Sequence, residues 1–228
     1  MRTQISRRHL LKSAAAAGVG LAAMKSRTIA AGDVAFKAGL IGCGGRGNGA
    51  AGDILKAAQK TGIKVELTAV HDVYEGQAKN SARHFNVGAA GTFWDFDGYK
   101  KLIDSGVDIV ILATPPGFRP EHFEAVVAAG KHCFCEKPVA TYAQDCRRFL
   151  KAAEESVRKN LTVVAGTQRR HQSNYVETVA KLHGAIGDIR ALRAYWCGGP
   201  VMKGRPRTPG QKDMDFQLKA WYLSLIHI

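Results

Sequence analysis

Short apolar runs alternate with longer helical stretches through the middle of this chain, and this alternation restricts the possible folds more than any other feature. The apolar runs are residues 36–41, 65–70, 107–113, 132–135 and 161–165. Runs of this length are typical of strands that are buried on both faces of a sheet. Helices between them require parallel strands joined by right-handed crossovers. We therefore expect a doubly wound α/β domain over residues 34–166.

Helical periodicity fills the intervals between these runs. The predicted helices are residues 50–60, 75–85, 97–104 and 121–129, and a further one begins after residue 141. Gly130 suits the left-handed conformation that follows a helix end, and Thr141 is the expected N-cap of the next helix. Ligands in such folds bind at the carboxyl ends of the strands, so the residues that follow each strand are the functional candidates.

The first 31 residues differ in composition from the rest of the chain. Arg7 and Arg8 stand in S-R-R-H-L-L-K, which resembles the twin-arginine export motif, and a weakly apolar run and small residues follow. The apolar run, residues 14–24, is shorter than the ~20 residues that cross a bilayer. We expect residues 1–31 to be a Tat signal peptide, the Tat translocase to be a partner during export, and the protein to be periplasmic or otherwise exported.

The net charge of +14 does not indicate a nucleic-acid-binding protein. Residues 1–31 hold six basic residues and no acidic one, and the other lysines and arginines are scattered rather than set in a stripe with aromatic residues. The five cysteines are odd in number and lack the C-x-x-C spacing of a zinc site. We expect no nucleic-acid partner, no disulfide framework and no metal.

A glycine-rich loop directly follows the first predicted strand. Gly42, Gly44 and Gly47 match the pattern G-x-G-x-x-G, in which missing side chains permit a tight turn, close approach of a pyrophosphate and packing of a helix on the sheet. The N-terminus of the following helix offers free N–H groups to phosphates. Together with Gly45 and Arg46, these residues predict the pyrophosphate site of a dinucleotide.

Asp72 follows the second apolar run. A carboxylate at this place accepts hydrogen bonds from the adenosine ribose and repels a 2′-phosphate, and no Arg or Lys follows in residues 73–75. We therefore expect NAD in preference to NADP. Two alternatives remain open, because Asp72 lies further from Gly42 than is usual and Arg46 could contact a phosphate: a solvated turn aspartate, and NADP as the cofactor.

Two later segments resemble a known family. Thr114-Pro115 and the sequence A-G-K-H-C-F-C-E-K-P at residues 129–138 resemble the T-P and A-G-K-H-x-x-x-E-K-P signature of the Gfo/Idh/MocA oxidoreductases, which include glucose-fructose oxidoreductase and inositol 2-dehydrogenase. Residues 168–172 and 184–189 also resemble the family's passage into its second domain. The resemblance implies a Rossmann domain followed by an α+β domain with a mostly antiparallel sheet.

The resemblance also implies roles for individual residues. Thr114 and Pro115 would line the side of the nicotinamide ribose, and Glu136 would hydrogen-bond that ribose. Lys137 would be catalytic and would also contact the cofactor, since its ammonium could hydrogen-bond the reacting hydroxyl. The alternative for Lys137 is a surface lysine before Pro138, for which the family often has a cis peptide bond.

The sequence departs from the family at two places. Arg119 occupies a position where many relatives carry a histidine, and His122 lies one helical turn further on. The family's acid–base pair of an aspartate and a histidine belongs to the second domain, of which we expect only the start, over residues 167–222, including one helix at 174–182 and a strand-like run at 189–196. Residues 223–228 resemble translated adapter sequence and are expected to be a non-native tail. We expect this fragment to be inactive and the full-length protein to be a homo-oligomer.

The function implied by the resemblance is an NAD-dependent oxidoreductase. It would move hydride between the nicotinamide and a hydroxyl-bearing carbon of a sugar, inositol or related polyol, which would be its small-molecule partner. Two alternatives remain open: an NAD-dependent glycoside hydrolase that uses transient oxidation and elimination, and a non-catalytic dinucleotide-binding protein. A net redox change distinguishes the dehydrogenase from the hydrolase, because the hydrolase would release sugar without consuming free NAD.

Overall fold

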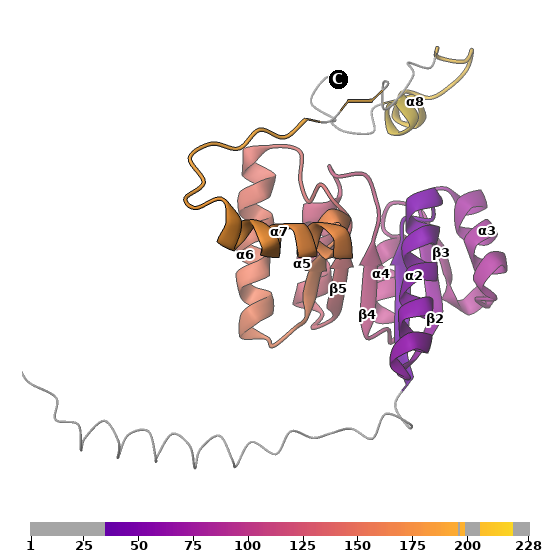
Figure 1. Cartoon of the computed structure of the whole chain (residues 1–228). Coiled ribbons are helices and arrows are strands. Elements are labelled where there is room, and N and C mark those ends of the chain that lie inside the picture. Colours follow the sequence, from indigo (N-terminus) through magenta and orange to yellow (C-terminus); the bar gives the residue numbers. More distant parts are fainter. Residues whose placement is uncertain (1–34, 196, 199–205, 221–228) are drawn as a thin grey trace, which may run out of the picture. The chain divides into compact units, whose positions relative to one another are not determined.

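The computed structural model describes residues 35–195, 197–198 and 206–220. The expected signal peptide at residues 1–31 and the expected tail at residues 223–228 lie outside the described residues. The described chain contains a six-stranded sheet with helices on both faces (Figure 1). This confirms the predicted doubly wound α/β class.

The six strands are all parallel and follow the order β3-β2-β1-β4-β5-β6. They are β1 (Ala35–Ile41), β2 (Lys64–Asp72), β3 (Thr92–Trp94), β4 (Ile109–Leu112), β5 (His132–Cys135) and β6 (Val163–Ala165). The chain adds strands on one side of β1 up to β3 and then crosses to the other side at β4. The order therefore reverses between β1 and β4, which is where ligands bind in open α/β sheets.

The helices of the described chain are α2 (Gly45–Thr61), α3 (Glu75–Phe85), α4 (Gly98–Asp104), α5 (Arg119–Ala128), α6 (Ala143–Arg158), α7 (Ser173–Ala185) and α8 (Asp213–Ala220). Two short 3₁₀ turns, η1 (Ala89–Gly91) and η2 (Gln168–His171), accompany them. Among the described residues, no helix is both long and apolar enough to cross a bilayer.

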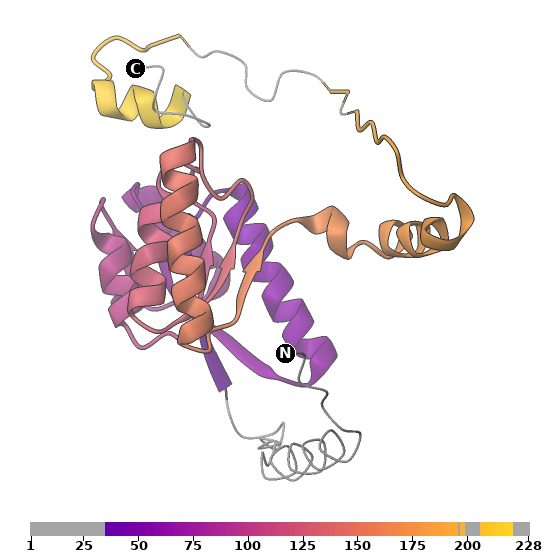
Figure 2. The ribbon, with the colours of Figure 1, turned by 90° about the vertical axis from the view of Figure 1, so that its left-hand side faces the viewer.

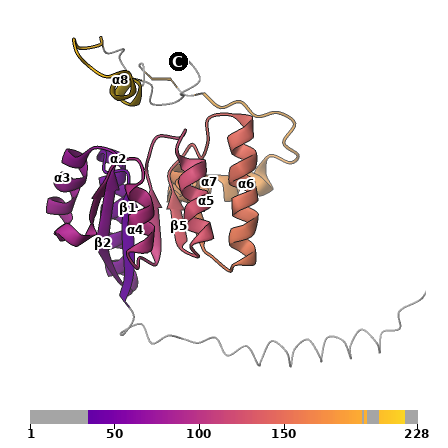
Figure 3. The same ribbon diagram turned by 180° about the vertical axis from the view of Figure 1, so that it is seen from behind.

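Two apolar cores lie on opposite faces of the sheet, because successive side chains of a strand point to opposite faces. In β1, Leu40 packs in the core that holds Ala51 of α2, whereas Ile41 packs in the core that holds Leu102 of α4 and Phe123 of α5. Figure 2 looks toward one edge of the sheet with α2 on one side and α5 and α6 on the other, and Figure 3 shows the face that carries α4, α5 and α6. Burial on both faces explains why the central strand β4 is continuously apolar.

Three predictions of local structure differ from the observed elements. The strand β3 was not predicted, because it is three residues long and only Thr92 in it is buried. Residues 189–195 form no strand, although their alternation favoured one, and Trp196 lies outside the described residues. Thr141 does not cap α6: the N-cap position is Tyr142, and the Thr141 hydroxyl is buried without a hydrogen-bond partner.

Candidate cofactor-binding site

A cavity of about 370 Å³ lies at the carboxyl ends of β1, β2 and β4. Its lining includes eight of the predicted site residues, which are Gly42, Gly44, Gly45, Arg46, Gly47, Asp72, Thr114 and Pro115. They come from three separate strand ends, and the reversal of strand order between β1 and β4 brings those ends together. The volume is within the range of cavities that bind small molecules and cofactors.

Two glycines of the loop after β1 are required by close packing. Gly42 has φ +100°, and a Cβ there would lie 2.7 Å from the backbone of Ala113 and Thr114. A Cβ on Gly47 would lie 1.8 Å from the carbonyl oxygen of Gly42. The loop can therefore fold against the end of β4 only with glycine at both positions.

The other two glycines leave an open surface where a phosphate group would lie. A Cβ on Gly44 or Gly45 would meet nothing within 4 Å. The helix α2 begins at Gly45, earlier than the sequence predicted, and has no acidic residue in its first turn. The first N–H groups of α2 and its dipole therefore favour an anion at this point. This geometry fits the pyrophosphate of a dinucleotide.

Asp72, the last residue of β2, joins the glycine loop to the turn before α3. Its carboxylate accepts hydrogen bonds from the backbone N–H of Cys43 at 2.9 Å and from that of Tyr74 at 3.0 Å. A carboxylate has about four lone-pair directions, so two remain for further donors. Asp72 can therefore hold the loop and still accept bonds from two ribose hydroxyls.

A row of ring side chains forms another wall of the cavity, and the sequence analysis missed most of it. His71 is buried, with Nε2 at 2.8 Å from the carbonyl oxygen of Asp95 and Nδ1 without a partner in the described structure. Burial lowers its pKa. Gly98 makes room for this ring, since a Cβ there would lie 2.7 Å from His71 Cδ2. The only sequence signal for His71 was its place directly before Asp72.

His122 continues this row from α5. Its ring lies 4.2 Å from the ring of Tyr99 between centroids, and its Nδ1 lies 3.3 Å from the hydroxyl of Thr114. Burial lowers the pKa of His122 to about 3, so the imidazole is neutral near pH 7. The Tyr99 hydroxyl donates to Glu121 at 3.1 Å, and burial raises the pKa of Tyr99. The aromatic rings of this wall suit contact with a flat ring of a ligand, and the carboxylates of Asp95, Asp97 and Glu121 also line the cavity.

The buried thiols near the site are not arranged as nucleophiles. Burial raises the pKa of Cys43 and of Cys135 to about 12, and it also raises the pKa of Cys133 well above its usual value. All five cysteines of the chain are free thiols. Because the thiolate is the reactive form, these three groups are inert near neutral pH and act as small apolar residues.

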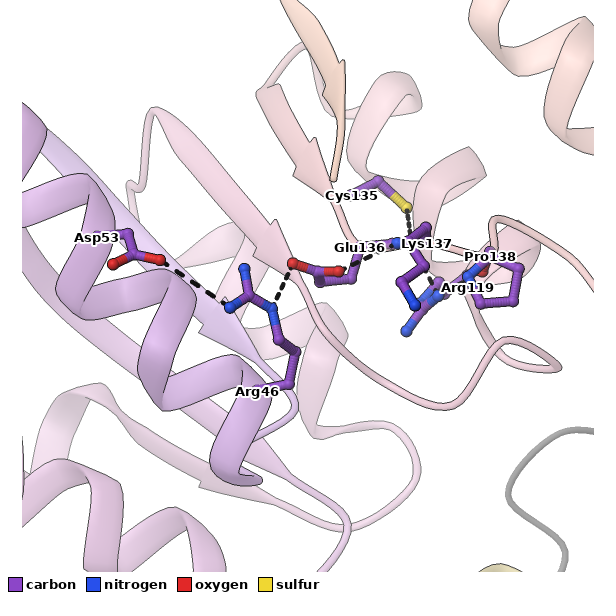
Figure 4. A network of polar contacts seen from close by, with 7 residues as sticks. All are labelled: Arg46, Asp53, Arg119, Cys135, Glu136, Lys137 and Pro138. Atoms are coloured by element: carbon purple, nitrogen blue, oxygen red, sulfur yellow. Dashed lines mark hydrogen bonds and ion pairs between the residues drawn. The ribbon is translucent and has the colours of Figure 1, made fainter. Parts of the chain in front are cut away.

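Glu136 lies directly after β5 and is bound to the glycine loop. Its Oε1 is 2.6 Å from Nε of Arg46, and its side chain is only 4% exposed (Figure 4). Gly166, after β6, leaves room for the carboxylate, because a Cβ there would lie 2.9 Å from it. Glu136 does not line the cavity itself, but its partner Arg46 does.

Lys137 is a predicted site residue that the structure places outside the cavity. Its side chain is exposed, and it is not among the residues that line the cavity. Its backbone N–H donates to Glu136 Oε2 at 3.2 Å, and its peptide bond to Pro138 is cis. Arg119, which stands where relatives carry histidine, also lies outside the cavity lining and contacts this turn from the side of α5.

Comparison with known proteins agrees with this geometry. The family model for oxidoreductases with an NAD-binding Rossmann fold, of the Gfo/Idh/MocA group, matches residues 36–165. Inositol 2-dehydrogenase of Salmonella paratyphi B is 31% identical over 143 residues, which are 62% of this chain and 40% of that protein. Inositol 2-dehydrogenase of Paracoccus denitrificans is 34% identical over 154 residues, 66% of this chain and 43% of that protein.

Solved structures show the same similarity. The WlbA dehydrogenase of Bordetella pertussis, in complex with NADH and UDP-GlcNAcA, has a TM-score of 0.53 and 25% identity, over 68% of this chain and 42% of that one. The myo-inositol 2-dehydrogenase of Lactobacillus plantarum has a TM-score of 0.56 at 24% identity, over 68% of this chain and 43% of that one, which supports the fold. In these matches the chain spans less than half the length of its relatives.

Proposed function

Since the chain belongs to the Gfo/Idh/MocA oxidoreductase family and has its NAD-binding Rossmann fold, we propose that it is the cofactor-binding part of a sugar or polyol dehydrogenase. The reaction would transfer hydride between NAD and a hydroxyl-bearing carbon of a sugar, inositol or related polyol. The observation that carries the proposal is the meeting of the glycine loop, Asp72 and Thr114 around one cavity at the point where the strand order reverses.

The residues around the cavity can hold each part of a dinucleotide. Gly44, Gly45 and the start of α2 would receive the pyrophosphate, and Asp72 the hydroxyls of the adenosine ribose. The row of ring side chains that includes Tyr99 and His122 would contact a flat ring of the cofactor. When bound, NAD supplies the hydride acceptor, and the protein contributes binding, orientation and exclusion of water.

The carboxyl end of β5 would serve the nicotinamide half of the cofactor. Glu136 is buried and anchored by Arg46, so its carboxylate is held in one place for a ribose hydroxyl. Lys137 is the neighbouring exposed cation, and its ammonium would hydrogen-bond the substrate hydroxyl at the open side of the site. Hydrogen-bond donation from Lys137 is the only acid–base role that we assign within the described residues.

Two lines of support favour a sugar or polyol over other substrates. The curated relatives named above are inositol 2-dehydrogenases, and the WlbA structure contains a nucleotide sugar acid. Neither supports the glycoside hydrolase alternative, which we do not propose. The non-catalytic alternative predicts NAD binding without turnover, so an activity assay separates it from the dehydrogenase.

The test has two parts. Titration of NAD and NADP into the protein should show NAD binding more tightly, and absence of NAD binding would refute the proposed function. A full-length protein that contains this chain should then form NADH with a polyol such as myo-inositol or with one of a panel of sugars, whereas we expect the chain alone to show no turnover. Tight NAD binding without turnover on any of them would favour the non-catalytic alternative.

We also propose that the protein is exported by the twin-arginine translocase and acts in the periplasm or outside the cell. The support is the motif at Arg7 and Arg8 together with the weakly apolar run behind it. Export in the folded state suits a protein that binds a dinucleotide before it leaves the cytoplasm. Assembly of the full-length protein into a homo-oligomer is a further proposal, which rests on the family resemblance alone.

A further inference from the structure

Arg119 is a fully buried arginine that the cavity described above does not use. It is 1% exposed and is the first residue of α5. A buried guanidinium is unfavourable unless its N–H groups are hydrogen-bonded, because it keeps its charge in a protein interior. Its hydrogen-bond partners therefore indicate what it does.

Two of these partners are backbone carbonyls of the residues on either side of Lys137. NH1 of Arg119 donates to the carbonyl oxygen of Glu136 at 2.8 Å and to that of Pro138, so the two contacts bracket Lys137 (Figure 4). Hydrogen bonds from a charged donor are stronger than those between neutral groups. One guanidinium nitrogen thus holds the peptide units that follow Glu136 and Pro138, which lie on either side of the Lys137–Pro138 peptide bond.

The turn needs such an anchor because the sheet no longer holds it. The N–H of Glu136 still donates to the carbonyl of Leu112 in β4, at 2.9 Å. Beyond that bond the chain leaves the sheet, and no helix or strand forms until α6 begins at Ala143. Arg119 is thus a link between this turn and α5, the helix that follows Thr114.

We propose that Arg119 is the positioning residue of the turn formed by Glu136, Lys137 and Pro138, and that it sets the affinity of the site for the nicotinamide half of the cofactor. The proposal rests on the proposed function, because it assigns that half of NAD to this turn. Where relatives carry histidine, an imidazole nitrogen has at most one N–H, whereas a terminal guanidinium nitrogen has two and can reach both carbonyls. Arg119 touches neither the cavity nor the substrate, so its effect acts through the turn.

A purely structural role would predict a different pattern of binding. ADP contains the adenosine and the diphosphate but lacks the nicotinamide half, so it contacts the glycine loop and Asp72 without reaching the turn. Loss of a residue that only stabilises the fold would weaken the binding of ADP and of NAD alike. Loss of the positioning residue would weaken the binding of NAD alone.

The experiment measures the dissociation constants of NAD and ADP by calorimetry for the full chain and its variants Arg119→Met and Arg119→Lys. Arg148→Met is the matched control, since Arg148 pairs with Glu124 on α5 at 2.6 Å and lies on the exposed surface. Arg119→Met should weaken the binding of NAD on the order of tenfold and leave the dissociation constant of ADP within about twofold of the wild-type value. Arg119→Lys should fall between Arg119→Met and the wild type, because an ammonium still donates to carbonyls.

The outcomes separate the two proposals. Equal weakening of NAD and ADP, or no change in either, would overturn the role of Arg119. If Arg119→Met does not fold, the changes in NAD and ADP affinity of Arg119→Lys are compared in the same way. If the wild-type chain binds NAD no more tightly than ADP, the assignment of the nicotinamide half to the turn is refuted instead.

Discussion

The guanidinium Nε of Arg46 lies 2.6 Å from the carboxylate Oε1 of Glu136, and this contact joins the loop after β1 to the turn after β5. The two residues are 90 positions apart in the sequence. Glu136 is nearly inaccessible to solvent, whereas Arg46 is 52% exposed and lines the cofactor cavity. The pair therefore connects the expected pyrophosphate site with the expected nicotinamide-ribose site.

Replacing Arg46 with Met should weaken NAD binding by about tenfold or more. The change removes a cation beside the pyrophosphate and leaves the buried Glu136 carboxylate without its charged partner, and a charge-assisted hydrogen bond contributes roughly 1.5–3 kcal/mol. Calorimetric titration of NAD measures the effect. The control is Asp53→Asn, because Asp53 lies 4.0 Å from Arg46 on the exposed surface, where ion pairs contribute little. Unchanged affinity in Arg46→Met would mean that the pair is irrelevant to the cofactor.

Replacing Asp72 with Asn should shift cofactor preference toward NADP. The amide cannot repel a 2′-phosphate, and it keeps only one oxygen to accept from the N–H groups of Cys43 and Tyr74. We expect NAD to bind on the order of tenfold more weakly and the ratio of NAD to NADP affinity to fall.

Asp108→Asn is the matched control for Asp72→Asn. Its carboxylate also accepts from a backbone N–H, that of Lys37 at 2.8 Å, but in an exposed contact near the start of β1 rather than at the cavity. It should lower stability slightly and leave the preference unchanged. Equal or tighter binding of NADP by the wild-type protein would refute the role given to Asp72.

Two glycines of α2 should respond oppositely to alanine. At Gly47 the new Cβ would lie 1.8 Å from the carbonyl oxygen of Gly42, so Gly47→Ala should cost roughly 1–3 kcal/mol or more of stability. At Gly52 nothing lies within 4 Å, so Gly52→Ala should stabilise the helix by about 0.5–1 kcal/mol. Thermal unfolding of the two variants measures both. A Gly47→Ala protein as stable as the wild type would show that the loop packs differently.

The buried His122 should make stability depend on pH below neutrality. Burial lowers its pKa from 6.5 to about 3, so the unfolded chain binds the proton more readily than the folded one between these values. The free energy of unfolding should therefore be highest above about pH 6.5 and should fall as the pH decreases toward 3. The total loss should be on the order of a few kcal/mol. His71, whose pKa burial also lowers, acts in the same direction.

Chemical denaturation at a series of pH values tests this dependence. The variant His122→Gln should show a flatter profile, because glutamine does not titrate. The exposed His84, replaced by Gln, should leave the slope as in the wild type. An identical slope in His122→Gln and the wild type would assign the dependence to other groups.

Export should depend on the arginine pair near the start of the sequence. Replacing Arg7 and Arg8 with Lys in a reporter fusion should retain the reporter in the cytoplasm, because the twin-arginine route requires both guanidinium groups. Replacing Arg2 with Lys is the control and should not alter export. A reporter exported equally well by the double variant would count against this route.

Much of the fold followed from the sequence because its signals are local. Burial on both faces makes the central strand β4 continuously apolar, and Gly130, with φ +70°, ends the segment after α5 as its residue type suggests. The glycine loop was recognisable for the same reason, since its glycines follow one another at a fixed spacing directly after a strand. The short strand β3 was not predicted because three residues are too few to show a periodic pattern of apolar side chains.

Tertiary structure decided the contacts that unite the site. The parallel order of the strands brings the residues after β1 and β5 to one edge of the sheet, and only there does Arg46 meet Glu136. Likewise, no sequence pattern assigns Arg119 to the carbonyls around Lys137, because hydrogen bonds to backbone carbonyls leave no signature in the residues that provide them. The sequence determined which residue types stand at each strand end, and the folded sheet determined their partners, since distances between strand ends depend on how the whole chain is packed.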